Sequence, residues 1–418
     1  MKRRHALALR LALSLALCLT VCLWGLFGCV DDTSGAASAV NTLRPASADL
    51  LILRSDYSST SLSWARSETA EVLSHDFFHS GTVVNASGLA LSGDVVLPSA
   101  GFTKDSAAVL DRGQSLITWV GGAAPLPAQW VVAEGFNGNP QDLFRLPDGG
   151  AAVVRAQSDP SPPVDAEGGD TAGDDVIVFD AQGAPRGTIP LATEATLPDG
   201  FAFAGRGHLR GDELWLPLAS FSKDFTQVGP AKVVVISLST FTVTRRFSVP
   251  GLRNCTTLRA SGDAGVVGTC SGSYRASATE QREQSGLFSL PWAAAPDSAA
   301  TVILSGDTWS KGGGVGFEVV PTSLSSGWFV RWGSIDEPTS PDRIYHFDAG
   351  DKLEMIYQAE GPFRIGQLIG DSDRLWFTER LRTGGDVVAL ELGVKPVVLT
   401  AIPTPPGALP AVGLARMR

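Results

Sequence analysis

One short pattern recurs along this chain: a five-residue apolar run that often ends in Asp or another polar residue, as in residues 176–180 and 344–348. Its copies begin at positions 60, 107, 176, 233, 286, 344 and 387. The intervals between them range from 43 to 69 residues, with the excess in loops. Self-similarity at such a period is typical of proteins built from stacked supersecondary units. The chain is therefore predicted to contain seven structural units.

Each unit contains further strand-like segments on both sides of the recurring run. Residues 150–156 precede the copy at Val176 and residues 186–191 follow it, and residues 212–218 and 242–249 flank the copy at Val233 in the same way. A further apolar stretch lies ahead of each of these groups of three strands, which gives four strands per unit. Short strands at this spacing, separated by Gly, Pro and Asp and without a helical period, predict an all-β chain. Four-stranded units of about 40 to 50 residues predict the antiparallel blades of a seven-bladed β-propeller.

A ring of blades has to close, because an open array leaves an unpaired edge strand. Residues 409–417 form a strand-like segment that belongs to no unit of its own. The first unit, from Asp49 onward, lacks its innermost strand. We therefore predict that this C-terminal strand pairs beside residues 49–55 and closes the propeller.

The third unit carries a family resemblance. Residues 139–155 begin with Asn-Pro and continue through a Pro-Asp-Gly turn into a valine-rich strand, and residues 176–180 read Val-Ile-Val-Phe-Asp. This unit resembles the repeat of YVTN-type and NHL-type seven-bladed propellers, as found in bacterial lipoproteins, and units four and seven match it in part. The resemblance implies the propeller architecture. It implies no particular activity, because propellers host binding, scaffolding and catalysis alike.

The first 28 residues have the features of an export signal. Four basic residues accompany an apolar run from Ala6 to Leu26, and the sequence Phe27-Gly28-Cys29 follows, with Phe27 larger than the residue usual at that position. This arrangement is typical of a bacterial lipoprotein signal. The alternatives are a plain secretory signal and a transmembrane anchor, since about 20 apolar residues can span a bilayer. We predict removal of residues 1–28 and lipidation of Cys29.

The residues after Cys29 are small and polar, as expected of a flexible tether. We assign the tether to residues 29–45 and the propeller to residues 46–418. The lipid anchor predicts a protein of the cell envelope that is attached to a membrane. Because Val30 is not the Asp that retains enteric lipoproteins at the inner membrane, we expect the outer membrane of a Gram-negative bacterium.

Charge excludes one class of partner. The formal net charge is −10, and it becomes −14 once the four basic residues of the signal are removed. Affinity for phosphate backbones comes from Lys and Arg side chains, so an acidic chain of this kind is not expected to bind nucleic acid.

The cysteines divide by position. Cys18 and Cys22 lie in the signal and Cys29 takes the lipid, which leaves Cys255 and Cys270 for the folded domain. Two cysteines in an exported protein predict a disulfide. The midpoint between them falls in a turn-like segment, so a hairpin would place them opposite each other, within bridging distance. The alternative, a metal site, lacks further thiols and a nearby His.

Few residues suggest chemistry. Arg206 and His208 lie where the innermost strand of the fourth unit is expected to meet its turn, near the channel mouth, and we predict them as ligand contacts; the alternative for His208 is simple packing. We assign no catalytic residue, no metal ligand and no cofactor. The carboxylates of residues 165–175 are a candidate calcium loop, although the ligand spacing of a calcium hand is absent and a solvated loop is favoured.

Two functions remain. The first is a non-catalytic envelope lipoprotein whose propeller binds or scaffolds a protein, peptide or glycan. The alternative is a propeller enzyme, lactonase-like or quinone- or calcium-dependent, with its site in the central channel. The first is favoured because no motif in the chain indicates a reaction.

Overall fold

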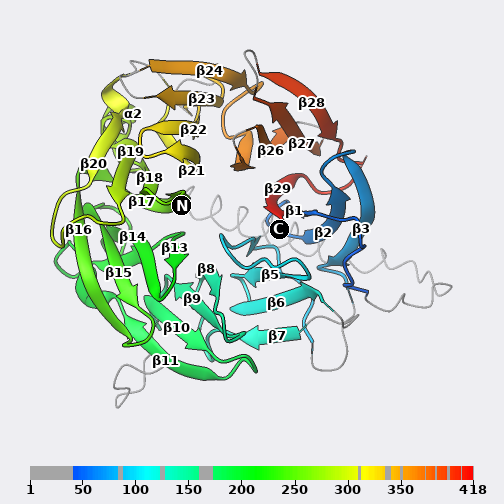
Figure 1. Ribbon diagram of the computed structural model, residues 1–418, viewed down its shortest axis with the longest axis horizontal. Coiled ribbons are helices and arrows are strands. Elements are labelled where there is room, and N and C mark those ends of the chain that lie inside the picture. The colour runs from blue at the N-terminus through cyan, green and yellow to red at the C-terminus, as the bar shows by residue number, and fades with distance from the viewer. Residues whose placement is uncertain are drawn as a thin grey trace, which may run out of the picture. The chain divides into compact units, whose positions relative to one another are not determined.

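The computed structural model describes residues 41–82, 88–122, 128–159, 173–308, 312–334, 340–348, 352–371, 373–381, 384–392, 396–405 and 407–417. The predicted signal, Cys29 and most of the predicted tether lie outside these ranges. Seven antiparallel sheets are arranged in a ring (Figure 1). This confirms the predicted seven-bladed, all-β propeller.

We number the blades from 1 to 7 in chain order and give the strands of each from the axis outward. They are β29 (Ala411–Arg416), β1 (Leu50–Ser55), β2 (Thr60–Arg66) and β3 (Glu71–His79) in blade 1; β4 (Val95–Val96), β5 (Ser106–Asp111), β6 (Leu116–Gly121) and β7 (Ala128–Val131) in blade 2; β8 (Pro140–Arg145), β9 (Ala151–Arg155), β10 (Asp175–Phe179) and β11 (Pro185–Pro190) in blade 3; β12 (Phe201–Ala204) with β13 (His208–Arg210), then β14 (Glu213–Phe221), β15 (Pro230–Ser237) and β16 (Thr242–Arg253) in blade 4; β17 (Cys255–Ser261), β18 (Gly265–Ser271), β19 (Ser285–Pro291) and β20 (Thr301–Ser305) in blade 5; β21 (Val315–Ser323), β22 (Ser326–Arg331), β23 (Arg343–Asp348) and β24 (Lys352–Gln358) in blade 6; β25 (Ile365–Gly370), β26 (Arg374–Leu381), β27 (Gly384–Glu391) and β28 (Val397–Ile402) in blade 7.

The middle strands of the blades are apolar because both of their faces are buried. In β9, Ala151 and Val153 pack against blade 2, whereas Ala152 and Val154 pack against blade 4. Each pair of neighbouring blades has its own apolar cluster between the sheets. A strand buried on both faces reads as a continuous apolar run instead of an alternating one, which explains the repeated pattern in the sequence.

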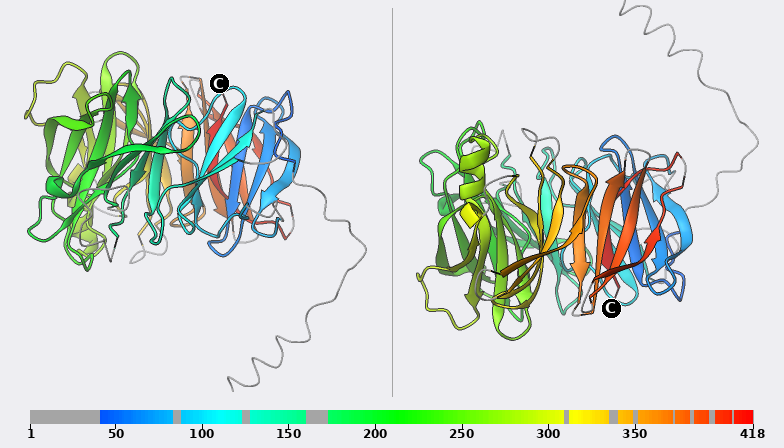
Figure 2. Two further views of the ribbon diagram at one scale, coloured as in Figure 1. Left: turned by 90° about the horizontal axis from the view of Figure 1, so that it is seen from below. Right: turned by 90° about the horizontal axis from the view of Figure 1, so that it is seen from above.

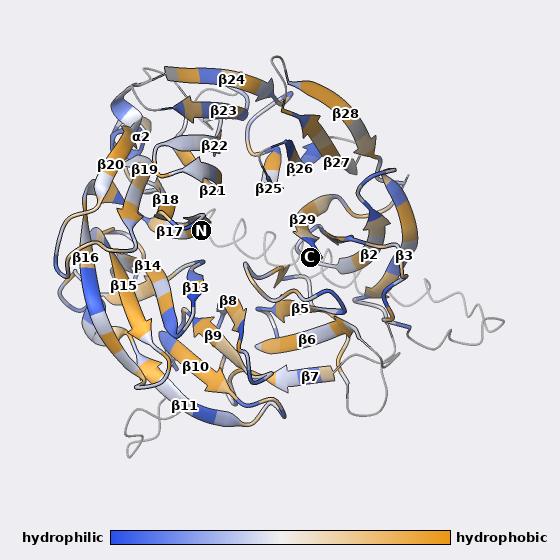
Figure 3. Ribbon diagram, viewed as in Figure 1, coloured by the Kyte–Doolittle hydropathy of each residue, from blue (hydrophilic) through white to orange (hydrophobic). Residues whose placement is uncertain are grey.

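The outermost strands are more polar, and the hydropathy colouring shows this contrast in blades 3 and 4 (Figure 3). In β16 exposed and less exposed residues alternate along residues 242–249, and Arg245 and Arg246 interrupt the apolar positions. Charged residues on edge strands hinder pairing with other chains.

The C-terminal strand closes the ring as predicted. β29 pairs antiparallel with β1, with Leu414 opposite Ile52, and it occupies the innermost position of blade 1. Leu414 is fully buried in the cluster between blades 7 and 1. The first blade is thus assembled from both ends of the propeller segment.

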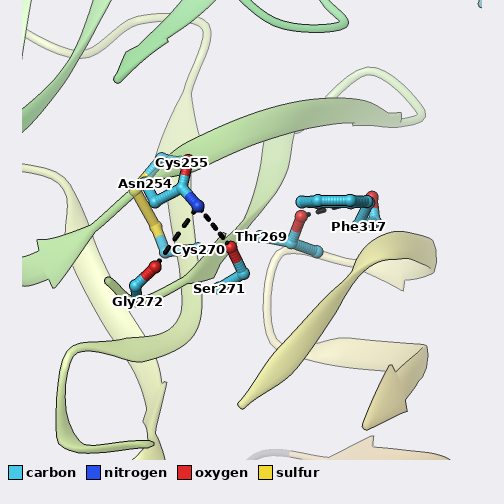
Figure 4. The surroundings of a disulfide bond; sticks show 7 residues. All are labelled: Asn254, Cys255, Thr269, Cys270, Ser271, Gly272 and Phe317. Carbon is cyan, nitrogen blue, oxygen red and sulfur yellow. Dashed lines mark hydrogen bonds between the residues drawn. A yellow bond between two sulfur atoms is a disulfide. The ribbon is translucent and has the colours of Figure 1, made fainter. Parts of the chain in front are cut away.

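The predicted disulfide is also present. Cys255 in β17 lies directly opposite Cys270 in β18, with Cα atoms 3.9 Å apart, and both residues are fully buried. Asn254 precedes the bridge, and its Nδ2 donates to Ser271 Oγ (2.8 Å) and to the carbonyl of Gly272 (3.2 Å) (Figure 4).

The structure differs from the sequence-based expectation at two places. The recurring run at Ala107 forms β5, the second strand of its blade, whereas the equivalents at 176 and 233 lie in third strands. Second and third strands are both buried on two faces, so an apolar run does not distinguish them. Thr42, assigned to the tether, is fully buried, and its carbonyl accepts a hydrogen bond from the Gly121 N–H (2.7 Å).

Helices are few in the described part of the chain. The α-helix α2 (Ala278–Glu283) lies between β18 and β19, and Ser277 caps it by accepting a hydrogen bond from the Glu280 N–H. Two short 3₁₀ helices cover Ala192–Glu194 and Gly306–Thr308. None of the helices in the described ranges has the length and apolar character needed to cross a bilayer.

Candidate functional site

The two faces of the ring carry different loops. Neighbouring strands of a blade are antiparallel, so the first strand begins, and the second ends, at the same face. Isolated parallel bridges join Ala100 to Phe144 and Arg206 to Thr257, on the axial sides of neighbouring blades, so these blades point the same way. In side view the strands run between the two faces (Figure 2). We call the face where first strands begin the entry face.

A cavity of about 450 Å³ lies on the axis at the entry face. All seven blades contribute to its lining, mostly through the starts of first strands and the ends of second strands. Its volume falls within the range of about 300 to 1,000 Å³ that is usual for ligand sites. We call this cavity the cup.

Charged side chains form the floor of the cup. Arg206 Nη1 donates to Glu318 Oε1 (2.9 Å), and Arg259 Nη2 donates to Glu318 Oε2 (3.1 Å). Arg259 of blade 5 also reaches Ser99 of blade 2, donating from Nη1 to its Oγ (2.8 Å). Because these contacts join blades from opposite parts of the ring, they cross the axis and close the cup. We call Arg206, Arg259 and Glu318 the floor, of which Arg206 and Glu318 line the cup.

Asp142 holds the backbone around Arg206. This fully buried carboxylate accepts hydrogen bonds from the Ser99 N–H (2.6 Å) and the Gly207 N–H (2.9 Å). Burial raises the pKa of Asp142, while its hydrogen bonds and the nearby Arg206 and Arg259 oppose that rise. The carboxylate thereby fixes the interruption between β12 and β13 at which Arg206 lies.

The charge of the lining is opposite to that of the chain as a whole. Of the four charged side chains that line the cup, Arg112, Arg206 and Arg380 are cationic and only Glu318 is anionic. Arg112 forms an ion pair with Asp94. Glu318 pairs with Arg206 and Asp94 with Arg112, so the cup carries only a small excess of positive charge, although the protein as a whole is acidic.

Aromatic side chains surround the opening. Tyr57, Phe317 and Phe363 are 65%, 40% and 46% exposed. Trp332 connects two of them, because its ring lies 4.6 Å from Phe317 and 6.0 Å from Phe363 between centroids. We call these four residues the rim. Large exposed apolar groups that gather around a cavity indicate a binding surface.

Two rim residues have a left-handed backbone, with φ of 69° for Tyr57 and 55° for Phe363. Bulky residues rarely adopt this conformation, and such strain is often found at ligand sites. In the Tyr57 turn, Asp56 Oδ1 accepts from the N–H groups of Ser58 (2.8 Å) and Ser59 (2.7 Å). Arg380 also braces the tyrosine, donating from Nη2 to its hydroxyl (3.1 Å).

The buried carboxylate of Asp342 holds the other side of the rim. Its Oδ1 accepts from the N–H groups of Gly333 (2.7 Å) and Phe363 (2.8 Å), and its Oδ2 accepts from those of Arg364 (2.7 Å) and Ile365 (2.9 Å). Burial raises the pKa of Asp342, and the same four hydrogen bonds oppose the rise. One carboxylate thus anchors the backbone next to Trp332 and that of Phe363.

The blade with the disulfide also supports the rim. Thr269 precedes Cys270 in β18, and its Oγ1 donates to the carbonyl of Phe317 (3.3 Å) (Figure 4). The bridged hairpin therefore lies directly beside the strand that presents Phe317.

The structure separates the two residues predicted as ligand contacts. Arg206 lines the cup, as described above. His208, the first residue of β13, lies beyond the interruption that contains Arg206, toward the opposite face, and is not among the residues that line the cup. Its ring stacks on Trp292 with 5.5 Å between centroids. Burial lowers the pKa of His208, as do the charges of Arg259 and Arg210.

The rim was not predicted from the sequence. The tryptophans that follow the signal are spread singly through the units, as core residues would be, and an exposed ring such as Trp332 has the same local pattern. The available signal was the turn chemistry at Asp56, because Asp favours tight turns. For Phe363 the sequence carries no such signal, since Asp342 is remote from it along the chain.

Metal-ligand side chains do not gather in the described ranges: no group of three or more His, Cys, Asp or Glu residues there is arranged to hold an ion. Most of the candidate calcium loop, residues 165–172, lies outside those ranges. At its end, Asp175 is fully buried and binds Arg155 through both oxygens, at 2.8 and 2.6 Å. Asp175 therefore takes part in an ion pair of the core.

Comparisons with known proteins give the fold alone. No family model matches the chain, and no curated protein sequence does. Among solved structures, regucalcin from Agrobacterium tumefaciens, a calcium-binding protein, matches with 16% identity over 68% of this chain and 82% of its own (TM-score 0.39). An acylaminoacyl peptidase from Pyrococcus horikoshii matches with 11% identity over 84% of this chain (TM-score 0.40), and a prolyl endopeptidase with 12% identity over 90% (TM-score 0.49). The matches span 46% and 51% of the two peptidases.

Proposed function

We propose that this protein is a lipid-anchored component of the cell envelope, whose propeller binds a ligand in the cup without catalysing a reaction. The observation that carries the proposal is the cup itself, a cavity of about 450 Å³ with exposed aromatic rings at its opening. Residues of all seven blades converge on it. We expect the ligand to be a protein, peptide or glycan outside the cytosol.

The side-chain chemistry of the cup supports binding. Trp, Tyr and Arg dominate the contacts that carry most of the energy of binding interfaces, and the lining includes Tyr57, Trp332 and Arg380. Tyr57 and Phe363 carry exposed rings on a left-handed backbone, which the hydrogen bonds of Asp56 and Asp342 hold in place. A ligand that contacts these rings would give that conformation a use.

Two features support the envelope. The first is the lipoprotein-type signal with Cys29 at its border. The second is the disulfide between Cys255 and Cys270, since disulfides persist mainly in oxidising compartments outside the cytosol.

A photo-crosslinking side chain at position 363 tests the proposed binding function. The matched control is the same side chain at Met355, which lies on the outer strand β24 and is 51% exposed, against 46% for Phe363. In living cells we expect a specific adduct from position 363 and none from position 355. Equal adducts from both positions, or none from position 363 in a folded protein, would contradict binding at the cup. Stoichiometric calcium in the purified protein would instead favour a propeller enzyme.

A further inference from the structure

We infer that the cup receives the C-terminal end of a peptide, with the terminal carboxylate bound by Arg206 on the floor and apolar side chains held by the walls and the rim. This inference rests on the proposed binding function and specifies its ligand. Four features of the cup lead to it: its closed floor, the free donors of Arg206, two unpaired hydroxyl groups and the apolar walls.

Because the floor is closed, a polymeric ligand can enter the cup only by one of its ends. The contact between Arg259 and Ser99 joins blades 5 and 2 across the axis, and Glu318 bridges Arg259 to Arg206. A polymer cannot pass through a channel that side chains cross in this way. A terminus can enter from the entry face and stop at the floor.

Arg206 has guanidinium N–H donors that no described residue accepts. A guanidinium carries five N–H donors and binds a carboxylate through two of them. Within the described residues, the guanidinium of Arg206 makes one direct hydrogen bond, from Nη1 to Glu318. Glu318 is shared with Arg259, and the buried Asp142 also interacts with both arginines, so the charges of the floor are balanced. A ligand carboxylate would therefore satisfy unused N–H donors of Arg206 and not an excess of positive charge.

Two hydroxyl groups beside Arg206 also lack partners. Thr256 and Thr257 line the cup, and Arg206 forms a bridge with Thr257. The Oγ1 atoms of both threonines are buried, and neither has a hydrogen-bond partner among the described residues. Unsatisfied buried polar atoms are rare in proteins and call for a specific explanation. Both oxygens are shielded from solvent, so rotation of the threonine side chains about χ1 would bring them to a ligand carboxylate at Arg206 as an acceptor.

The walls favour a peptide over an acidic sugar. Between the floor and the rim the cup is lined by aliphatic side chains, including Leu53, Val95, Leu97, Ile365 and Val412. Sugar hydroxyls buried against such walls would lose their hydrogen bonds to water without replacement, which is costly. Apolar side chains of a peptide would gain from the same contact.

The experiment compares two pools of randomised pentapeptides that differ only at the C-terminus, one with the free acid and one with the amide. The full-length chain in detergent is immobilised, and retained peptides are identified by mass spectrometry. We expect the acid pool to be retained about 10- to 100-fold better, since a hydrogen bond to a charged group contributes that much to affinity. Apolar residues should be enriched at the last positions.

Variants test the assigned contacts. Arg206→Gln leaves Glu318 paired with Arg259 and should remove the preference for the free acid, while Arg206→Lys should retain part of it. The matched control is Arg186→Gln, an arginine on the outer strand β11 that pairs with Asp148 and is 44% exposed. It should behave like the unmodified protein. Thermal unfolding of each variant establishes that it is folded.

A second variant serves if Arg206→Gln does not fold. Thr257→Val keeps the shape of the side chain and removes a hydroxyl that has no partner in the described protein. A purely structural threonine would tolerate this change without loss of peptide retention. We expect several-fold weaker retention of the acid pool with unchanged thermal stability.

The remaining outcomes separate the inference from the proposed function. Equal retention of acids and amides, or an acid preference that survives in Arg206→Gln, would overturn the carboxylate assignment. Retention of oligogalacturonate but of neither peptide pool would overturn the peptide and leave ligand binding intact. If a folded protein retained none of the three probes, the inference would fail; a cross-link at position 363 would then show that the cup binds something else.

Discussion

Single buried carboxylates fix the loops that build the cup. Asp142 and Asp342 are fully buried, and each accepts backbone N–H bonds from segments remote in the chain. Each pays a desolvation penalty, visible as a raised pKa, that its hydrogen bonds offset in part. At the residue scale the cup thus depends on two side chains that do not line it.

A third buried carboxylate gives a prediction about pH. Burial raises the pKa of Asp174 to about 6 from its ordinary value of 3.8, with a further increase from Asp175. The folded protein therefore binds this proton more tightly than the unfolded chain does. Its contribution to stability is present below pH 4 and is lost as the pH rises to about 6.

The variant Asp174→Asn removes this titration. Relative to the unmodified protein, it should gain about 1 to 2 kcal/mol in free energy of unfolding between pH 4 and pH 7, allowing for solvent screening. Denaturant unfolding at several pH values measures the difference. Asp199→Asn is the control, because Asp199 is exposed and, like Asp174, has a positive φ. A constant difference between Asp174→Asn and the unmodified protein would contradict the assignment.

At the scale of elements, the apolar strand is the repeating unit because neighbouring blades bury both of its faces. The same burial limits what the pattern can predict, because it does not show which strand of a blade an apolar run forms. β5 and β6 of blade 2 are both largely buried, so the run at Ala107 was assigned to the wrong strand of its blade. Pairing partners are a property of the folded sheet and are not encoded in local composition.

The closing strand β29 is the element on which the ring depends most directly. Deleting residues 408–418 would leave β1 with an unpaired edge and expose Ile52, which faces Leu414. We expect loss of cooperative thermal unfolding, or a midpoint lowered by tens of degrees. Unchanged thermal stability would show that the strand does not close the ring.

Point variants give a finer measurement of the same element. Leu414→Ala, at a fully buried position, should cost about 2 to 5 kcal/mol. Leu399→Ala on the outer strand β28 is the control, because Leu399 is 40% exposed and such changes are usually within about 0.5 kcal/mol.

At the scale of the whole molecule, we expect the acidic propeller to reach its location through the lipid anchor. Residues 1–40 lie outside the described ranges, so this expectation comes from the sequence. It agrees with the negative net charge of the chain, because like charges would keep a protein without an anchor away from anionic lipid surfaces.

Cys29→Ser tests the anchor. The variant should lose labelling by fatty acid and should no longer fractionate with membranes after cleavage, or should accumulate with its signal uncleaved. Cys22→Ser, a cysteine within the same signal, is the control and should be processed normally. Mass spectrometry of the unmodified protein that found the signal intact and Cys29 without lipid would refute the prediction.

The number of blades, the closing strand and the disulfide could be predicted from the amino-acid sequence alone. Each of these follows from local patterns: apolar runs that two faces bury, a strand without a unit, and two cysteines about a turn. The candidate site, by contrast, could be found only in the folded ring. Arg206 of blade 4 binds Glu318 of blade 6, and Asp342 of blade 6 binds the backbone of Phe363 at the start of blade 7, so the packing of the blades around the axis brings these residues together. A cup shared by seven blades has no local signature, because no single blade contains it.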